Sequence, residues 1–157
     1  MVVELTAPEA LPARLVVGAI AGFVATLVMD VPMERLPEGE TSYQVAAGVL
    51  SGEPLDSAPD GLATAVHYGA GTVSGVLFVG VTAAADLLLG GAPSFLSVIV
   101  AVVVQLPIMI VFFSYLVLVV YGQVPAERVP QVRRDWALSA SVYVAVLVAL
   151  TGPMALL

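Results

Sequence analysis

The chain alternates long apolar runs with shorter polar connections. The four runs, each about 19 residues or longer, lie at residues 13–31, 61–89, 94–121 and 135–157. A helix needs about 20 apolar residues to cross the hydrocarbon core of a bilayer, whereas a barrel strand alternates apolar and polar side chains over about 10 residues. Because the runs are continuous, the pattern predicts an all-α fold, an integral membrane bundle of four transmembrane helices.

The connection between the first two runs, residues 32–61, is polar and contains one short helical pattern. Thr41 followed by Gln44 fits a capping box, in which Thr41 caps the helix and Gln44 reaches back to the cap. The apolar residues that then share one face are Val45, Ala46, Val49 and Leu50. We expect a short interfacial helix at about 42–51, on the membrane surface or under the bundle; the alternative is an ordinary loop helix without membrane contact.

Composition agrees with a membrane location. The chain has 157 residues, of which 60% are hydrophobic and 11% charged, whereas soluble domains carry about 25% charged residues. This leaves too little polar surface to cover a water-soluble globule of this length. We therefore expect residues 1–157 to form a single transmembrane domain whose outer surface is solvated by lipid.

The arginines predict the orientation of the bundle, because cytoplasmic loops are enriched in basic residues. Four spans place both termini on one side of the membrane. That side carries Arg14 alone, and the basic residues of the other side are Arg35, Arg128, Arg133 and Arg134. We expect a multi-pass protein of the cell membrane with its termini outside and with the 32–61 and 122–134 loops in the cytoplasm.

The net charge of −7 and the absence of lysine bear on the partners of the chain. Acidic chains without lysine are typical of salt-loving archaea, because dense carboxylates stay hydrated and are screened in strong salt. An acidic chain does not favour nucleic acid, whose phosphates are neutralised by basic side chains. The expected partners are membrane lipid and either further copies of the chain, in a homo-oligomer, or a larger membrane complex.

Three residue types limit the chemistry. The sequence has no cysteine, no lysine and a single histidine, His67. This excludes disulfides, thiol nucleophiles and Schiff bases on lysine. One histidine is also a thin set for a catalytic zinc, which takes three protein ligands. We therefore expect no metal and no cofactor, and, since no catalytic motif is present, no enzyme.

Small residues line one face of each of the first two predicted helices. The residues of the first face, at a spacing of four, are Gly18, Gly22, Thr26 and Asp30. Those of the second face, at spacings of three or four, are His67, Gly71, Gly75, Phe78, Thr82 and Asp86. Glycines at GxxxG spacing let two helix backbones approach closely. Because the chain reverses between the helices, we expect the glycine pairs to meet and Asp30 to lie near His67 at the cytoplasmic end.

Asp30 and His67 form the candidate polar pair of the sequence. An ionisable group within a membrane span costs several kcal/mol unless it is paired or hydrated, and each of these two groups would relieve the other. The functional interpretation is a proton relay or a small-ligand site. The alternative is a helix-end pair that only sets the register of the two helices.

Polar residues elsewhere in the second and third runs have simpler interpretations. We expect Asp86 to be a solvated helix end. Gln105 and Pro107 lie inside the third run, where a proline frees a backbone carbonyl and bends a helix. The pair is expected to mark a packing kink, with the lining of a polar cavity as the alternative.

The start of the fourth helix carries two arginines, an aspartate and the tryptophan of the chain. We expect Asp135 to cap the helix N-terminus. Arg133, Arg134 and Trp136 are expected to anchor the bundle at the cytoplasmic interface, where basic and aromatic side chains are enriched. A lipid-headgroup site on the arginine pair is the alternative.

Two short stretches resemble a pattern in small membrane proteins of unknown function. They are Gly22-Phe-Val-Ala-Thr26-Leu-Val-Met29-Asp30 and His67-Tyr-Gly-Ala-Gly71-Thr-Val-Ser-Gly75. The chain is similar here to the YagU-like group and to related haloarchaeal families, in which a first helix carries G-x-x-A/G-T-x-x-M and a later helix opens with H-x-x-x-G-x-x-x-G. The resemblance implies no activity. It implies that the two faces belong together.

Three functions are open from the sequence. The first is a non-enzymatic accessory or structural subunit that packs through its glycine-rich faces. The second is an oligomeric small transporter or channel with Asp30 and His67 as a proton or ligand site, since four spans alone enclose little of a pore. The third is a membrane enzyme acting on a lipid or a quinone, with the same two residues as acid and base.

Overall fold

The computed structural model describes residues 11–121 and 124–155, and these residues form helices and no strand. The long helices are α1 (Leu11–Met33), α3 (Asp60–Leu88), α4 (Phe95–Val111) with its continuation η3 (Phe112–Tyr121), and α5 (Val129–Thr151). The short elements are α2 (Thr41–Ser51), η2 (Leu55–Ser57) and η4 (Gly152–Ala155). The predicted all-α bundle of four long helices and one short helix is therefore confirmed for the described residues.

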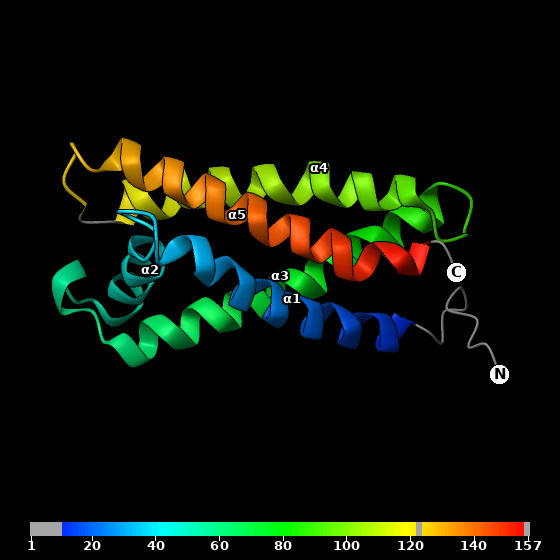
Figure 1. Cartoon of the computed structure of the whole chain (residues 1–157), viewed down its shortest axis with the longest axis horizontal. Coiled ribbons are helices and arrows are strands. Elements are labelled where there is room, and N and C mark those ends of the chain that lie inside the picture. Colours follow the sequence, from blue (N-terminus) through cyan, green and yellow to red (C-terminus); the bar gives the residue numbers. More distant parts are fainter. Residues whose placement is uncertain (1–10, 122–123, 156–157) are drawn as a thin grey trace.

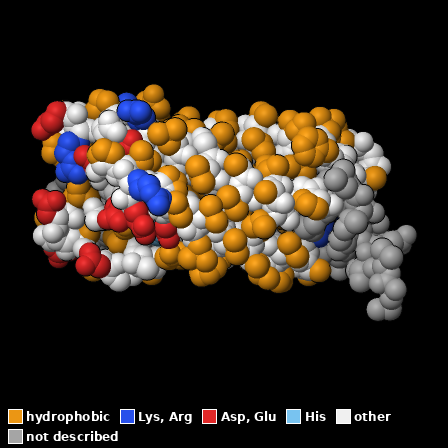
Figure 2. Space-filling view, in the orientation of Figure 1, with side chains coloured by type: hydrophobic (Ala, Val, Ile, Leu, Met, Phe, Trp, Pro, Cys, Tyr) orange, Lys and Arg blue, Asp and Glu red, His pale blue; other side chains and the backbone are white. Residues whose placement is uncertain are grey.

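The long helices match the thickness of a membrane. The shortest span has 23 residues, which at about 1.5 Å per residue exceeds the roughly 30 Å of hydrocarbon. Large apolar side chains are exposed on every long helix, for example at Ile20, Leu77, Val103 and Leu138. Figure 2 shows them as a broad apolar belt, with the charged side chains gathered mainly at one end. These are the features of a multi-pass membrane protein.

The helices pack as an antiparallel bundle with the short helix at one end. α1 packs against α3 and α5, and α4 packs against the same two helices. α1 begins and α5 ends at one end of the bundle, whereas α2 lies at the opposite, charged end (Figures 1 and 2). There α2 contacts α3 and η3. The core between the long helices includes Ala21, Ala25, Met29, Phe78, Val98, Ala101, Tyr143, Val144 and Leu147.

The fourth long helix starts earlier than the sequence pattern predicts. α5 begins at Val129 instead of Asp135, with Pro130 in its first turn. Proline is well tolerated there because the first amide groups of a helix have no partner within it. The expectation that Asp135 caps the helix was wrong, because Asp135 lies inside the helix and is fully buried.

The short helix α2 occupies the predicted segment, but the capping box does not form. The residue at the N-cap is Glu40, and its side chain makes no capping hydrogen bond. The Thr41 hydroxyl instead donates to Glu38 Oε2 at 2.6 Å. The carboxylate of the preceding turn is a stronger acceptor for this hydroxyl, since hydrogen bonds to charged groups are the stronger ones.

Candidate functional site

Glycines bring the backbones of α1 and α3 into direct contact. A Cβ added to Gly22 would lie 2.6 Å from the carbonyl oxygen of Gly71 and 2.9 Å from Gly75 Cα. A Cβ added to Gly18 would lie 2.8 Å from the carbonyl oxygen of Gly75. Real side chains do not fit at these distances, so the close approach requires glycine. Because the glycine faces meet within the chain, they are not free to bind another one.

Thr26 continues this contact one turn further along α1. Its hydroxyl donates to the carbonyl oxygen of Gly22 at 2.8 Å, and the side chain is fully buried. The same side chain fills the space in which a Cβ of Gly71 would stand. The two helices therefore stay in register up to the charged end of the bundle, where Asp30 follows on α1.

At the charged end, Asp30 receives two hydrogen bonds from α3. His67 Nε2 lies 2.7 Å from Asp30 Oδ1, and the Tyr68 hydroxyl donates to Oδ2 at 2.5 Å. The His67 side chain is 8% exposed and the Asp30 side chain is 25% exposed. Because Nε2 faces a carboxylate, it carries the hydrogen of the bond. The structure thus brings the sequence-predicted pair together and adds Tyr68, which the sequence reasoning did not include.

An acidic crevice opens beside this cluster at the charged end. It has a volume of about 180 Å³ and is lined by Asp30, Met33, Glu34, Glu40, Tyr43, Thr64, His67 and Tyr68. Burial, with a smaller contribution from the Glu40 carboxylate, raises the pKa of Tyr43 to about 12. The phenol of Tyr43 therefore stays neutral. Within the described residues, no group of three or more histidine, aspartate or glutamate side chains is arranged to hold a metal ion.

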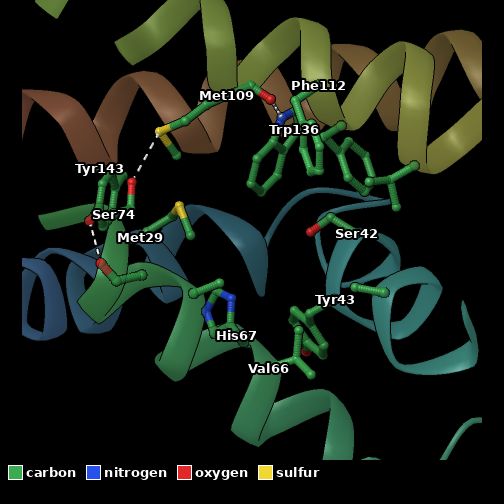
Figure 3. Close-up of a pocket in the computed structure, with 15 residues that line it drawn as sticks. Met29, Ser42, Tyr43, Val66, His67, Ser74, Met109, Phe112, Trp136 and Tyr143 are labelled. Carbon is green, nitrogen blue, oxygen red and sulfur yellow. Dashed lines mark hydrogen bonds between the residues drawn. The ribbon is translucent and has the colours of Figure 1, made fainter. Parts of the chain in front are cut away.

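A larger, apolar cavity (Figure 3) shares Tyr43 and His67 with the lining of the acidic crevice. Its volume is about 290 Å³. It lies between α2, α3, α5 and the α4–η3 helix, and the remaining residues that line it are Met29, Ser42, Ala46, Val66, Ala70, Gly71, Ser74, Met109, Phe112, Phe113, Val117, Trp136 and Tyr143. Three of these residues come from η3, which has π-helical geometry. Such segments occur frequently at functional sites.

The cavity opens on the flank of the bundle. Two of its lining residues are exposed on the outer surface, Ala70 on α3 and Phe112 at the start of η3. Both lie within helices long and apolar enough to cross a membrane. The exposed part of the cavity lining is therefore apolar.

Polar groups in the cavity wall are mostly satisfied. The Tyr143 hydroxyl donates to the carbonyl oxygen of Gly71 at 2.6 Å. The Ser74 hydroxyl donates to Met109 Sδ at 3.8 Å (Figure 3). The same hydroxyl accepts from Gln105 Nε2 at 2.8 Å. Gln105 also donates to the Ser74 carbonyl oxygen. Gln105 itself ties α4 to α3.

The two residues predicted to mark a kink or to line a cavity do not contact either space. Gln105 and Pro107 line neither the acidic crevice nor the apolar cavity. Gln105 is buried against α3, whereas Pro107 is exposed on the outer face of α4. The amide of Gln105 therefore supports packing between helices in the interior of the bundle.

The residues expected at the cytoplasmic interface point in different directions. Arg134 is exposed, whereas Arg133 donates to the carbonyl oxygen of Ser114 and stacks over the Tyr115 ring at 4.7 Å. The Trp136 ring lines the apolar cavity, and its Nε1–H donates to the carbonyl oxygen of Met109 at 3.1 Å (Figure 3). The contacts of Trp136 are thus made within the bundle.

At the opposite end of the bundle, the expectation of a solvated Asp86 was wrong. Asp86 is 3% exposed and accepts from Arg14 Nη2 at 2.8 Å and from the Ser94 backbone N–H at 3.2 Å. The antiparallel register of α1 and α3 brings the start of one helix to the end of the other. That register was available from the glycine spacing, and applying it to Arg14 would have predicted the pair.

A second unpredicted cluster ties the α1–α2 connection to α5. Arg128 donates from Nε and Nη2 to the two oxygens of Glu38, each at 2.7 Å. The Glu38 backbone N–H donates to Asp135 Oδ2 at 3.0 Å, and Gln131 donates to Oδ1 at 2.7 Å. The hydrogen bonds from Arg128 lower the pKa of Glu38, and those to Glu38 raise the pKa of Arg128. The course of two loops decides this pairing, so no spacing in the sequence indicates it.

Comparison of the chain with protein-family models, with curated proteins and with solved structures finds no match. The resemblance to the YagU-like group therefore stays a prediction that rests on the two short stretches. The function has to be argued from the site.

Proposed function

We propose that this multi-pass membrane protein is a binding protein, without catalytic activity, for a lipophilic molecule that enters the apolar cavity from the bilayer. The observation that carries the proposal is the apolar cavity itself, whose lining includes exposed Ala70 and Phe112 on two membrane-length helices and the buried ring of His67. Small-molecule sites are mostly apolar and carry a few polar groups that fix orientation. The cavity has this composition.

The Asp30–His67–Tyr68 cluster supports this function by giving the site a rigid polar end. The histidine ring is held through Nε2 by a carboxylate that is itself hydrogen-bonded by Tyr68. A ring fixed in this way presents the same face to every ligand, so little conformational entropy is lost on binding. Asp30 and Tyr68 thus hold the His67 ring in the position in which it contacts a ligand.

The accessory-subunit hypothesis loses the support of the glycine faces and keeps only that of a sequence without a catalytic motif. Packing against another chain needs glycine faces that are free, and Gly22 and Gly75 face each other inside the bundle. A transport path through the bundle has no support beyond the charged end either. The α3 residues Phe78 and Val79, between His67 and Asp86, are buried in the interior of the bundle. The apolar cavity is therefore the feature on which the proposed function rests.

The single tryptophan makes the proposal directly testable. Trp136 lines the cavity and is the only tryptophan of the chain. The purified protein in detergent is titrated with N-phenyl-naphthylamine, a neutral lipophilic dye, and energy transfer from Trp136 to the dye is measured. We expect a saturable signal in the wild type. Energy transfer that rises linearly with dye, without saturation, would reject the proposal.

Two alanines on α3 provide a matched pair of variants. Ala70→Phe places a ring at the entrance, and Ala84→Phe makes the same change at an exposed alanine that does not line the cavity. Ala70→Phe should weaken dye binding by about tenfold or more, since overfilling a packed site costs about 1–3 kcal/mol. Ala84→Phe should bind as the wild type does. Equal effects of both variants would show that the dye binds elsewhere.

We also propose that the charged end of the bundle, with α2, is cytoplasmic. The distribution of arginines supports this orientation, because cytoplasmic loops are enriched in basic residues. Arg14 alone lies at the opposite end. The chain has no cysteine, so single cysteines can be introduced at exposed positions, Leu50→Cys on α2 and Leu88→Cys at the other end. In intact cells a membrane-impermeant maleimide should label only Leu88→Cys. Labelling of Leu50→Cys alone would invert the orientation.

A further inference from the structure

A buried hydroxyl in the cavity wall has no hydrogen-bond partner among the described residues. Ser42 on α2 is 4% exposed, and its Oγ makes no hydrogen bond. The residue lines the apolar cavity, and Figure 3 shows its oxygen directed into that space. Buried polar side chains are nearly always paired, because an unpaired one keeps the full cost of losing water. The cavity thus contains a donor that a ligand can satisfy.

His67 supplies a second polar point on the α3 side of the same cavity. Its Nε2–H is engaged by Asp30, and within the described residues Nδ1 makes no hydrogen bond. In a neutral imidazole one nitrogen donates and the other accepts. With Nε2 donating to Asp30, Nδ1 is the acceptor of the neutral ring. The polar points of the cavity lining are thus the Ser42 hydroxyl on α2 and, in the neutral ring, the Nδ1 acceptor of His67 on α3.

The remaining lining is rich in aromatic side chains. Five of the residues that line the cavity are aromatic, namely Tyr43, Phe112, Phe113, Trp136 and Tyr143. Aromatic side chains pack favourably against another ring in offset or edge-to-face arrangements. The volume of about 290 Å³ lies at the lower end of the roughly 300–1,000 Å³ of small-molecule sites. It accommodates one ring system, and the opening on the flank lets an apolar tail extend into the lipid.

From these features we infer that the ligand is a ring-headed lipid of the quinol class: an aromatic ring with an apolar tail, one hydroxyl that donates to His67 Nδ1, and a second ring oxygen that accepts from Ser42 Oγ. The inference rests on the proposed function and names the ligand class of that site. It concerns binding alone and includes no electron transfer. The hydroxyl matters because the proposed complex uses the neutral form of His67, whose Nδ1 accepts a hydrogen bond; a quinone carbonyl in its place would find no donor there.

Three probes, each with one six-membered carbon ring and the same decyl tail, test the inference on the wild-type protein. They are a decyl para-benzoquinol kept reduced under argon, the corresponding quinone, and decylbenzene, which has no oxygen. Each is used to displace N-phenyl-naphthylamine, with energy transfer from Trp136 as the readout. We expect the quinol to bind about fivefold or more tightly than the quinone, the worth of one hydrogen bond, and the quinone more tightly than decylbenzene.

Variants assign the two contacts. Ser42→Ala should weaken binding of the quinol by about fivefold, and His67→Phe should abolish the preference for quinol over quinone. The control Ser141→Ala, an exposed serine of α5 whose hydroxyl bonds to its own helix, should change neither. Dye binding that all three probes displace equally would overturn the ligand class and leave the proposed function standing. Absence of saturable dye binding would reject both the proposed function and the ligand class.

Discussion

Gly75 offers the sharpest test of how the bundle is held together. A Cβ at this position would lie 2.6 Å from Gly22 Cα and 2.7 Å from Gly22 N, and closer still to the carbonyl oxygen of Gly18. Carbon atoms normally approach to about 3.5–4.0 Å. All three clashing atoms are backbone, so no side chain can rotate away and α1 has to move by about 1 Å. We expect Gly75→Ala to destabilise the bundle by about 1–3 kcal/mol, the usual cost of overfilling a packed interior.

Gly80 provides the control on the same helix. It is an α3 glycine with a normal helical backbone, and a Cβ added there meets no atom within 4 Å. Gly80→Ala should be neutral or stabilising by up to about 1 kcal/mol, since alanine has the higher helix propensity. The chemical change is identical in the two variants. The difference between them, about 1–4 kcal/mol, therefore isolates the contact between α1 and α3.

The assay is unfolding of the purified protein by denaturing detergent, followed through the fluorescence of the single tryptophan. The free energy of unfolding is compared among the wild type, Gly75→Ala and Gly80→Ala. Equal values for the two variants would refute the close approach of α1 and α3. A loss in Gly75→Ala alone would support it.

Three further predictions concern groups away from this contact. Arg14→Met leaves the buried Asp86 without its partner and should cost about 3–5 kcal/mol in the same unfolding assay, most of which Asp86→Asn in the same chain should restore. Ser42→Ala should stabilise the ligand-free protein by about 1 kcal/mol or more in thermal denaturation, because it removes an unpaired buried hydroxyl; a loss of stability would mean that the hydroxyl has a partner. The pKa of Glu38 is lowered on folding by Arg128, so this pair stabilises the protein above the ordinary pKa of 4.5, and the contribution is lost as the pH falls through the lowered value. Unfolding measured below pH 4.5 should therefore be less pH-dependent in Arg128→Met, and an unchanged profile would contradict the pairing.

The apolar cavity and the acidic crevice have two lining residues in common. Tyr43 and His67 line both spaces. Tyr43 stays neutral because burial raises its pKa to about 12. The bound head group would therefore meet the ring of His67 while the carboxylates remain in the crevice. This separation keeps charge out of the apolar space, where an unpaired charge is costly.

The secondary structure and the membrane location were readable from the sequence, because both depend on local properties of the chain. A continuous apolar run has to satisfy its backbone hydrogen bonds within itself in lipid, and a helix does so. The spacing of Gly22 and Gly75 likewise indicated which faces can come close. The neighbourhood of Asp30 and His67 followed from the reversal of direction between two consecutive helices.

The cavity, by contrast, depends on how separate segments pack. Its wall combines residues of α1, α2, α3, α4, η3 and α5, and a cavity is the space that these elements leave unfilled. The sequence around Trp136 suggests a membrane interface, and that around Ser42 suggests the start of a helix. Only the packing of α5 and α2 turns these two side chains towards His67. The partners of Asp86 and Asp135 arise in the same way. Periodicity along one helix indicates which face is buried, whereas the group that meets that face is chosen by the other helices.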